Sequence, residues 1–414
     1  MAMGKRWLER EGPRWVDEQI ITQNQYERIQ QLYEKSEGRF SAGLLPVLGS
    51  LLVGLGVLSF IAANWQTLPE TFRILLLCAA MIGSYVSGDR IIQRGKSSLG
   101  IAVVGIGLFL FGAGIILIGQ MFHMVAYSAL SLVIWGAAGA ALSYGYRSRY
   151  LSLLTLAILT AAQTYSLDNF STFSYAAFAL LVLGVGAVAY RCKDSVITTL
   201  WCLSALFHSF LYIISSDYAF GWFFLPLLLF YAAGDVMRTP SFRSAMQTVP
   251  LGAAFIVHMV LVVFHNEFFR IEHEPFNPIP YVYLPVAAAL LYLSWHGKRR
   301  RRDLRSASDW ILFLPFYYLP GGYGWLFALA ALFLFALYVL TEGYKTYNER
   351  RIRTGTALFL LASMVAYFTL TWDFMDKGLF FLGGGVLLLA LSWFLNRNNR
   401  QMIQQAPSDR RNTK

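Results

Sequence analysis

The sequence predicts an all-α, polytopic helical membrane protein with about 14 transmembrane helices and with both termini on the cytoplasmic side. The chain is 57% hydrophobic and 14% charged, whereas a soluble domain carries about 25% charged residues. The charges lie in short clusters, and the apolar runs between them are long enough to cross roughly 30 Å of hydrocarbon. The basic clusters also fall in alternate loops, which indicates one orientation.

The apolar runs divide residues 44–396 into fourteen predicted spans, which together form a transmembrane helical bundle. Most spans are bounded by charged or turn-forming residues. The predicted spans are 44–63, 69–87, 98–119, 126–145, 150–166, 172–190, 196–215, 219–237, 246–265, 279–296, 307–320, 322–342, 355–372 and 378–396.

Lysine and arginine indicate which loops are cytoplasmic, because cytoplasmic loops of membrane proteins are enriched in these residues. All of the 34 basic residues except Arg73, Arg270 and Lys377 lie in the N-terminal segment, the C-terminal tail or every second loop. The sequence therefore predicts an even number of spans and two cytoplasmic termini.

The span over residues 307–320, "ASDWILFLPFYYLP", is the weakest, because it is short and contains Pro315. The basic clusters before and after 307–342 are both predicted to be cytoplasmic, so two spans are needed between them. The proline indicates either a kink or a discontinuous helix of the kind found at transporter sites. A kinked helix is the preferred interpretation.

Residues 1–43 form a predicted cytoplasmic amphipathic helical segment. Thr22 with Gln25 three residues later fits a capping box, and Ile29, Leu32 and Tyr33 form an apolar stripe. A small helical hairpin packed on the cytoplasmic loops is favoured. Residues 1–40 could instead bind a cytoplasmic partner or lie on the membrane. Residues 397–414 are predicted to be a basic, disordered cytoplasmic tail.

Polar residues near the external helix ends suggest a cavity that opens outward. Gln120, His123 and Tyr127 would share one helix face if that helix continued, and polar groups in lipid are costly unless they face a bundle or a watery cavity. The alternative for each histidine is hydrogen bonding between helices as packing. The candidate cavity residues are Asn64, Arg73, Gln120, His123, Tyr127, Gln163, His208, Tyr212 and His258.

Arg73 lies about one turn inside the second span and has two possible roles. Its long side chain could snorkel outward and pair with Glu70, three residues before it. Its planar guanidinium could instead face inward and bind a phosphate or a carboxylate. The sequence leaves both roles open.

Several classes of function are not supported. No Walker-type phosphate loop, H-E-x-x-H, G-x-S-x-G or cysteine-pair metal site occurs, so no cofactor and no metal site is predicted. The basic charge follows from topology rather than from nucleic-acid binding. No signal peptide is predicted, because the first apolar run follows a long charged segment. The three cysteines imply no disulfides. The loop 265–281, which contains histidines and glutamates, is predicted to be a solvated acidic loop.

Two stretches carry a resemblance to a known family. "GSLLVGLGVLSFIAANWQTLPETFR" (49–73) and "GIILIGQMFHM" (114–124), with "IITQNQYERI" (20–29), resemble the prokaryotic predicted-membrane-protein domain-of-unknown-function family 2157. The resemblance covers roughly the first 145 residues and implies a bacterial or archaeal inner-membrane protein without an established activity. The matching positions are Asn64, Trp65, Pro69, Arg73, Gln120 and His123.

These features favour a transporter or flippase of a polar or amphipathic, envelope-related molecule, and a protein that is not an enzyme. The cavity would be lined by Arg73, Gln120, His123, His208 and His258. One alternative is a membrane-embedded transferase on a lipid-linked substrate, with His123 as general base and Arg73 holding phosphate. Another is a non-catalytic membrane sensor or scaffold. The expected partners are the lipid bilayer and a lipid-linked or small-molecule substrate.

Overall fold

Helices are the only regular secondary structure in the part of the chain that the computed structural model describes, which confirms the all-α class. The described residues are 12–20, 22–27, 45–56, 59–60, 63, 69–265, 279–301, 304–314, 316, 319, 323–371, 382–386 and 389. Asn64, the tail 397–414, loop residues 266–278 and most of the predicted span 378–396 lie outside these ranges.

Eight described helices are long and apolar enough to cross a membrane, which confirms the membrane class. Three further apolar helices are shorter: Leu45–Gly56, Leu130–Tyr146 and Phe220–Val236. The eight candidate spans are Glu70–Gln93, Ser97–Met121, Arg149–Phe170, Tyr175–Cys192, Ser195–Ser215, Pro240–Val263, Gly324–Lys345 and Glu349–Thr371.

The chain forms two compact units, Met1–Arg191 and Cys192–Lys414. The helices of the first unit follow the predicted spans closely. They are Leu45–Gly56, α3 (Glu70–Gln93), α4 (Ser97–Met121), α5 (Leu130–Tyr146), α6 (Arg149–Phe170), α7 (Tyr175–Ala179), the π-helix η2 (Leu180–Val185) and α8 (Gly186–Cys192).

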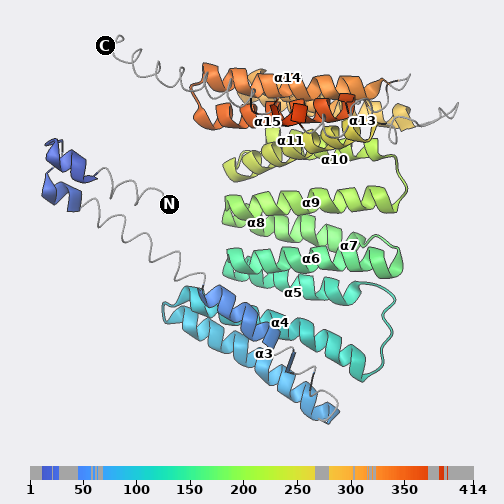
Figure 1. Cartoon of the computed structure of the whole chain (residues 1–414). Helices are drawn as coiled ribbons and strands as arrows, with labels where there is room; N and C mark the ends of the chain where they lie inside the picture. The colour runs from blue at the N-terminus through green and yellow to red at the C-terminus, as the bar shows by residue number, and fades with distance from the viewer. Residues whose placement is uncertain are drawn as a thin grey trace. The chain divides into compact units, whose positions relative to one another are not determined.

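Small residues allow the helices of the first unit to pack closely, and α3 lies beside α4 (Figure 1). A Cβ atom on Gly100 of α4 would lie 2.5 Å from the carbonyl oxygen of Gly88 on α3. Between α5 and α6, the Ser143 and Thr155 hydroxyls hydrogen-bond at 3.1 Å. This pattern of small residues and interhelical hydroxyls is typical of helix packing in lipid.

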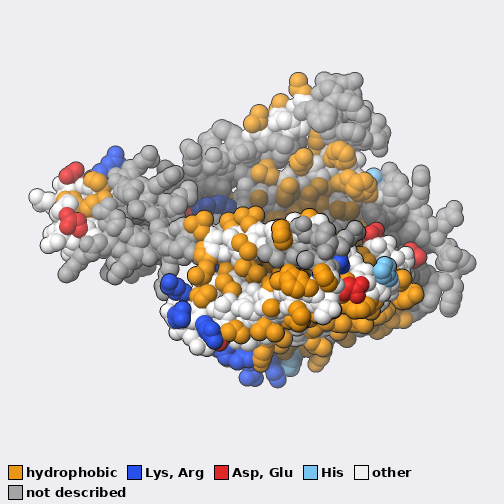
Figure 2. Space-filling view, turned by 90° about the horizontal axis from the view of Figure 1, so that it is seen from below, with side chains coloured by type: hydrophobic (Ala, Val, Ile, Leu, Met, Phe, Trp, Pro, Cys, Tyr) orange, Lys and Arg blue, Asp and Glu red, His pale blue; other side chains and the backbone are white. Residues whose placement is uncertain are grey.

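The surface of the first unit matches a membrane-facing surface. Helix α3 buries only Leu77 and Gly88 and exposes the apolar side chains of Phe72, Leu75 and Ile82. In Figure 2 the exposed face is largely hydrophobic, and Lys and Arg side chains gather at one end. Basic residues of this unit follow α3 and flank the α5–α6 turn, at positions Arg94, Lys96, Arg147 and Arg149.

The second unit contains α9 (Ser195–Ser215), the 3₁₀-helix η3 (Phe220–Phe223), α10 (Phe224–Val236), α11 (Pro240–Val263), α13 (Ile279–Arg301), the 3₁₀-helix η4 (Leu304–Phe313), α14 (Gly324–Lys345) and α15 (Glu349–Thr371). Helix α11 packs on α9, α10 and α14, and α14 packs on α15. Figure 1 shows α14 and α15 side by side. The side chain of Asp194 caps α9 by accepting hydrogen bonds from the Val196 and Ile197 amides.

The expected kinked α-helix over 307–320 is wrong for the residues described, which form a ten-residue 3₁₀-helix instead. η4 ends at Phe313, two residues before Pro315. This end agrees with the rule that proline disfavours helical backbone geometry in the residue before it. Runs of 3₁₀-helix longer than three or four residues are uncommon because their hydrogen bonds are poorly aligned. Contacts with other helices must therefore hold η4 in place.

The capping box predicted in the N-terminal segment is confirmed. The Thr22 amide donates to Gln25 Oε1 at 2.9 Å, and the Gln25 amide donates to Thr22 Oγ1 at 3.3 Å. Residues 12–17 and 23–27 are helical. The apolar stripe of Ile29, Leu32 and Tyr33 lies outside the described residues.

Candidate functional site

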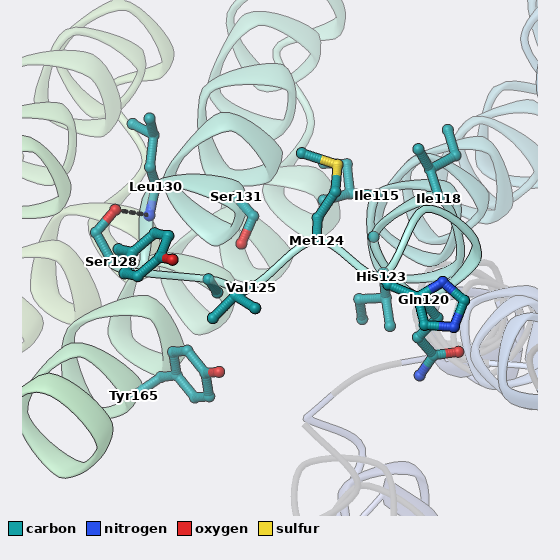
Figure 3. Close-up of a pocket in the computed structure, with 14 residues that line it drawn as sticks. Ile115, Ile118, Gln120, His123, Met124, Val125, Ser128, Leu130, Ser131 and Tyr165 are labelled. Carbon is teal, nitrogen blue, oxygen red and sulfur yellow. Dashed lines mark hydrogen bonds between the residues drawn. The ribbon is translucent and has the colours of Figure 1, made fainter.

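A cavity of about 690 Å³ lies at the C-terminal end of α4. Gln120 comes from the end of α4, His123 from the loop that follows α4, Ser131 from α5 and Tyr165 from α6 (Figure 3). The chain between α4 and α5, with Met124 and Val125, passes along the cavity. The 14 lining residues are Ile115, Ile116, Ile118, Gly119, Gln120, His123, Met124, Val125, Ala126, Tyr127, Ser128, Leu130, Ser131 and Tyr165.

The backbone ends α4 before the predicted polar face can form. The His123 amide donates to the Gln120 carbonyl at 3.3 Å, and the Met124 amide donates to the Gly119 carbonyl at 2.9 Å. These two bonds form a Schellman motif, with His123 in the left-handed conformation (φ 49°) that usually takes glycine. The helix ends at Met121, so His123 and Tyr127 lie in the following loop rather than on a continued helix.

The chemistry of the cavity suits an amphipathic molecule. Among its 14 described lining residues there is no Lys, Arg, Asp or Glu. The polar groups are the amide of Gln120, the imidazole of His123, and hydroxyl groups, while the remaining side chains are mostly aliphatic. The hydroxyl groups belong to Tyr127, Ser128, Ser131 and Tyr165. Apolar walls with a few polar groups are typical of ligand pockets, and the volume lies within their range of roughly 300–1,000 Å³.

Two other candidates of the first unit do not line this cavity. Arg73 is half-buried on α3, so neither of its two predicted roles is decided. Gln163 is fully buried on α6, and both polar atoms of its side chain lack a hydrogen-bond partner among the described residues. A buried amide without a partner lowers stability.

Replacing Gln163 with Leu should therefore raise the free energy of unfolding by about 1 kcal/mol, because the unpaired amide would be removed while the volume is kept. Thermal unfolding of the purified protein measures the change. Gln247→Leu is the matched control, since the Gln247 amide donates to Asp235 at 2.7 Å, and this variant should be destabilised. Equal losses in both variants would contradict the prediction.

The candidates of the second unit are packed residues. His258 is buried, its Nδ1 lies 2.9 Å from the Ala254 carbonyl oxygen, and its ring contacts Phe224 and Phe316. His208 is fully buried on α9 and contacts Phe207. The ring of Tyr212 contacts Tyr218. Within the first unit, the structure thus brings Gln120, His123 and Tyr127 together around one cavity.

The left-handed backbone at His123 gives a way to separate its structural and chemical roles. His123→Gly should stabilise the protein by about 1 kcal/mol, because an L-residue pays roughly 1–2 kcal/mol in this conformation and glycine does not. His123→Ala keeps the backbone penalty and also removes the ring. Thermal unfolding compares both variants with the wild type. A glycine variant less stable than the alanine variant would contradict the left-handed backbone, and an alanine variant less stable than the wild type would show that the imidazole itself stabilises the loop.

A buried ion pair in the second unit escaped the sequence analysis. The ammonium of Lys298 on α13 lies 3.2 Å from Asp235 Oδ1 on α10, and the two side chains are 1% and 3% exposed. The Lys298 ammonium also donates to the Tyr231 hydroxyl at 2.8 Å and to Ser306 Oγ of η4 at 2.8 Å. From the sequence, Lys298 was only one of the basic residues that mark a predicted cytoplasmic loop.

Further hydrogen bonds complete this polar network. The Tyr231 hydroxyl donates to Asp309 Oδ2 at 2.6 Å, and Ser294 Oγ donates to Asp235 Oδ2 at 2.5 Å. The Trp310 indole donates to Ser294 Oγ at 2.9 Å. We call the set of Tyr231, Asp235, Gln247, Ser294, Lys298, Ser306, Asp309 and Trp310 the η4 network, because three of its members belong to η4.

The described helices define a multi-pass membrane protein, and a cavity lies at the C-terminal end of α4. Residues 13–152 match a family model described as "Predicted membrane protein (DUF2157)", which confirms the resemblance predicted from the N-terminal stretches. The match ends within α6, so the cavity loop is inside it and the second unit is beyond it. No curated protein and no solved structure matches the chain.

Proposed function

We propose that this chain is a transporter or flippase of an amphipathic, envelope-related molecule in the bacterial inner membrane. The observation that carries the proposal is the cavity at the end of α4, with apolar walls, a few polar groups and no Lys, Arg, Asp or Glu among its described lining residues. Such walls suit the chain of a lipid-like molecule, and the amide, imidazole and hydroxyl groups suit a polar head group.

The topology in this proposal has 14 spans and both termini in the cytoplasm. It is supported by the basic residues at one end of the first unit's helices, since cytoplasmic loops are rich in Lys and Arg. The cavity lies at the opposite end of α4 from Lys96, so it would open toward the external side.

The proposed binding residues are now Gln120, His123 and Tyr127 from the original candidates, joined by Ser131 and Tyr165. Ser131 lies in the first turn of α5, where the sequence pattern does not predict a polar helix face. Tyr165 follows Gln163 on α6, and its proximity to the cavity depends on the packing of α5 against α6.

The transferase alternative is less well supported. It needs Arg73 to hold phosphate beside His123, and Arg73 is not among the residues that line the cavity. The scaffold alternative depends on residues 1–40 and on a cytoplasmic partner. It predicts that removal of these residues abolishes function, whereas the transport proposal predicts that lipid movement persists.

Lipid movement can be measured in proteoliposomes that contain fluorescent lipids, with dithionite as a quencher that reaches only the outer leaflet. The probes are nitrobenzoxadiazole-labelled phosphatidylglycerol, a labelled glycolipid and a labelled polyprenyl phosphate. With the wild-type protein, dithionite should quench the fluorescence of one probe completely, because the protein moves that lipid to the outer leaflet. Ser131→Phe should slow this movement by filling the cavity, and Ser87→Phe on the exposed surface of α3 is the control. Quenching that stops at the outer leaflet for every probe would overturn the proposal.

A further inference from the structure

The polar side chains of the cavity at the end of α4 can both donate and accept hydrogen bonds. A hydroxyl group has a donor and two acceptor positions, a side-chain amide has donors and an acceptor, and an imidazole in its neutral form has one of each. In Figure 3 the side chains of Gln120 and His123 lie on one side of the cavity, and those of Ser131 and Tyr165 lie on the other. A ligand between them would meet donors and acceptors on both sides.

The protein itself makes little use of these groups. Among the polar side chains that line the cavity, that of Ser128 hydrogen-bonds within the described part of the chain, where its hydroxyl accepts from the Leu130 amide at 3.4 Å. The other five polar side chains make no hydrogen bond to another described residue, and they belong to Gln120, His123, Tyr127, Ser131 and Tyr165. Their hydrogen-bonding capacity is therefore available to a ligand.

The kind of head group that fits follows from this capacity and from the charges around the cavity. A phosphate only accepts hydrogen bonds, and proteins bind it with the pure donors Arg and Lys. No Lys, Arg, Asp or Glu occurs among the described lining residues, and Arg73 on α3 and Asp168 on α6 are not among them. A sugar hydroxyl both donates and accepts, so it matches side chains that do the same. His123 is the one lining residue that can carry a positive charge, and the test must control for it.

Two tyrosine rings add a surface for a sugar ring. The side chains of Tyr127 and Tyr165 are 86% and 39% exposed, so their ring faces are accessible. The face of an aromatic ring is negative, and it attracts the weakly positive C–H groups on one face of a sugar. The apolar side chains of Ile116, Met124 and Val125 line the same cavity and are exposed, so they can contact an acyl chain.

We infer that this cavity selects a glycolipid, with an uncharged sugar as its head group, over lipids whose head group contains phosphate. The inference rests on the proposed function, because it names the substrate class of the same site. The sugar hydroxyls exchange hydrogen bonds with Gln120, Ser131 and Tyr165, the tyrosine rings pack on the sugar, and the acyl chains lie along the aliphatic wall.

Native mass spectrometry of the full chain in detergent tests the inference without a transport assay. Three probes carry the same dioleoylglycerol and differ only in the head group: a glucosyl group, a phosphoglycerol group or a hydrogen atom. The wild-type protein should bind the glucosyl probe with a dissociation constant about tenfold or more below those of the other two. One or two net hydrogen bonds correspond to a difference of this size.

Variants show whether the preference arises in the cavity. Ser131→Phe should abolish it by filling the space, and Gln120→Leu should weaken it by removing the amide. Ser87→Phe on α3 is the control and should bind as the wild type does. His123→Asn, which cannot be charged, should keep the preference for the sugar. Thermal unfolding shows that each variant is folded, and Gln120→Leu replaces Ser131→Phe if the phenylalanine variant is not.

Equal binding of the three probes, tighter binding of the phosphoglycerol probe, or a sugar preference that Ser131→Phe and Gln120→Leu both retain would overturn the inference. The proteoliposome assay separates this failure from failure of the transport proposal. Movement of a phosphate-containing probe without sugar preference would leave transport standing and refute glycolipid selection. Glucosyl binding in the cavity without movement of any lipid would support the binding site and refute transport.

Discussion

Replacing Lys298 with Met should lower the free energy of unfolding by about 3–5 kcal/mol, the largest single effect expected in this protein. The side chains of Lys298 and Asp235 are 1% and 3% exposed, so removal of the ammonium leaves a buried carboxylate without its counter-ion. Asp235→Leu should be similarly costly for the opposite reason. The double variant Lys298→Met with Asp235→Leu should recover most of the loss, because both charges are then absent.

An exposed ion pair of the same unit provides the control. Arg353 and Glu349 lie 2.8 Å apart on α15, and their side chains are 76% and 58% exposed. Arg353→Met should cost less than about 0.5 kcal/mol, since exposed pairs one turn apart are worth little in water. Chemical unfolding in detergent micelles compares the variants. If Lys298→Met is no more costly than Arg353→Met, the η4 network does not stabilise the second unit.

Gly100→Ala should destabilise the protein by about 1–3 kcal/mol, because the added methyl group has no space between α3 and α4. Its Cβ would lie 2.5 Å from the Gly88 carbonyl oxygen, and backbone cannot move aside as a flexible side chain can. Gly114→Ala, on the same helix, meets nothing within 4 Å. It should be neutral or slightly stabilising, because alanine favours helix more than glycine does.

The same unfolding measurements separate packing from helix propensity. A loss in Gly100→Ala with none in Gly114→Ala shows that α3 and α4 touch through their glycines. Equal behaviour of the two variants would mean that the close approach of α3 to α4 is absent in the protein.

Much of the fold could be predicted from the sequence, because lipid imposes strong constraints on composition and length. Apolar runs bounded by charges gave spans close to α3, α4, α6 and α9, and the Thr22–Gln25 capping box follows from local spacing. The prediction of a kinked α-helix over 307–320 was wrong, because the 3₁₀-helix η4 depends on contacts with residues that are distant in the sequence. The number of fourteen spans and the placement of the termini remain predictions.

The candidate site was only partly predictable. Gln120, His123 and Tyr127 were found by their polarity, but the turn that ends α4 depends on a left-handed residue at His123, and histidine gives little warning of such a turn. The partners of the η4 network are 63 residues apart for Lys298 and Asp235, and 78 for Tyr231 and Asp309. No periodic pattern links such positions, so only packing could reveal the buried pair.

The claim that the cavity binds an amphipathic molecule is tested most directly by photocrosslinking in the native membrane. A benzophenone amino acid at position 131, inside the cavity, is compared with the same group at exposed position 87. Mass spectrometry of the adducts identifies the captured molecules. We expect position 131 to capture one class of amphipathic molecule far above its share of the membrane, while position 87 captures bulk lipids. The same lipid mixture at both positions would contradict the account.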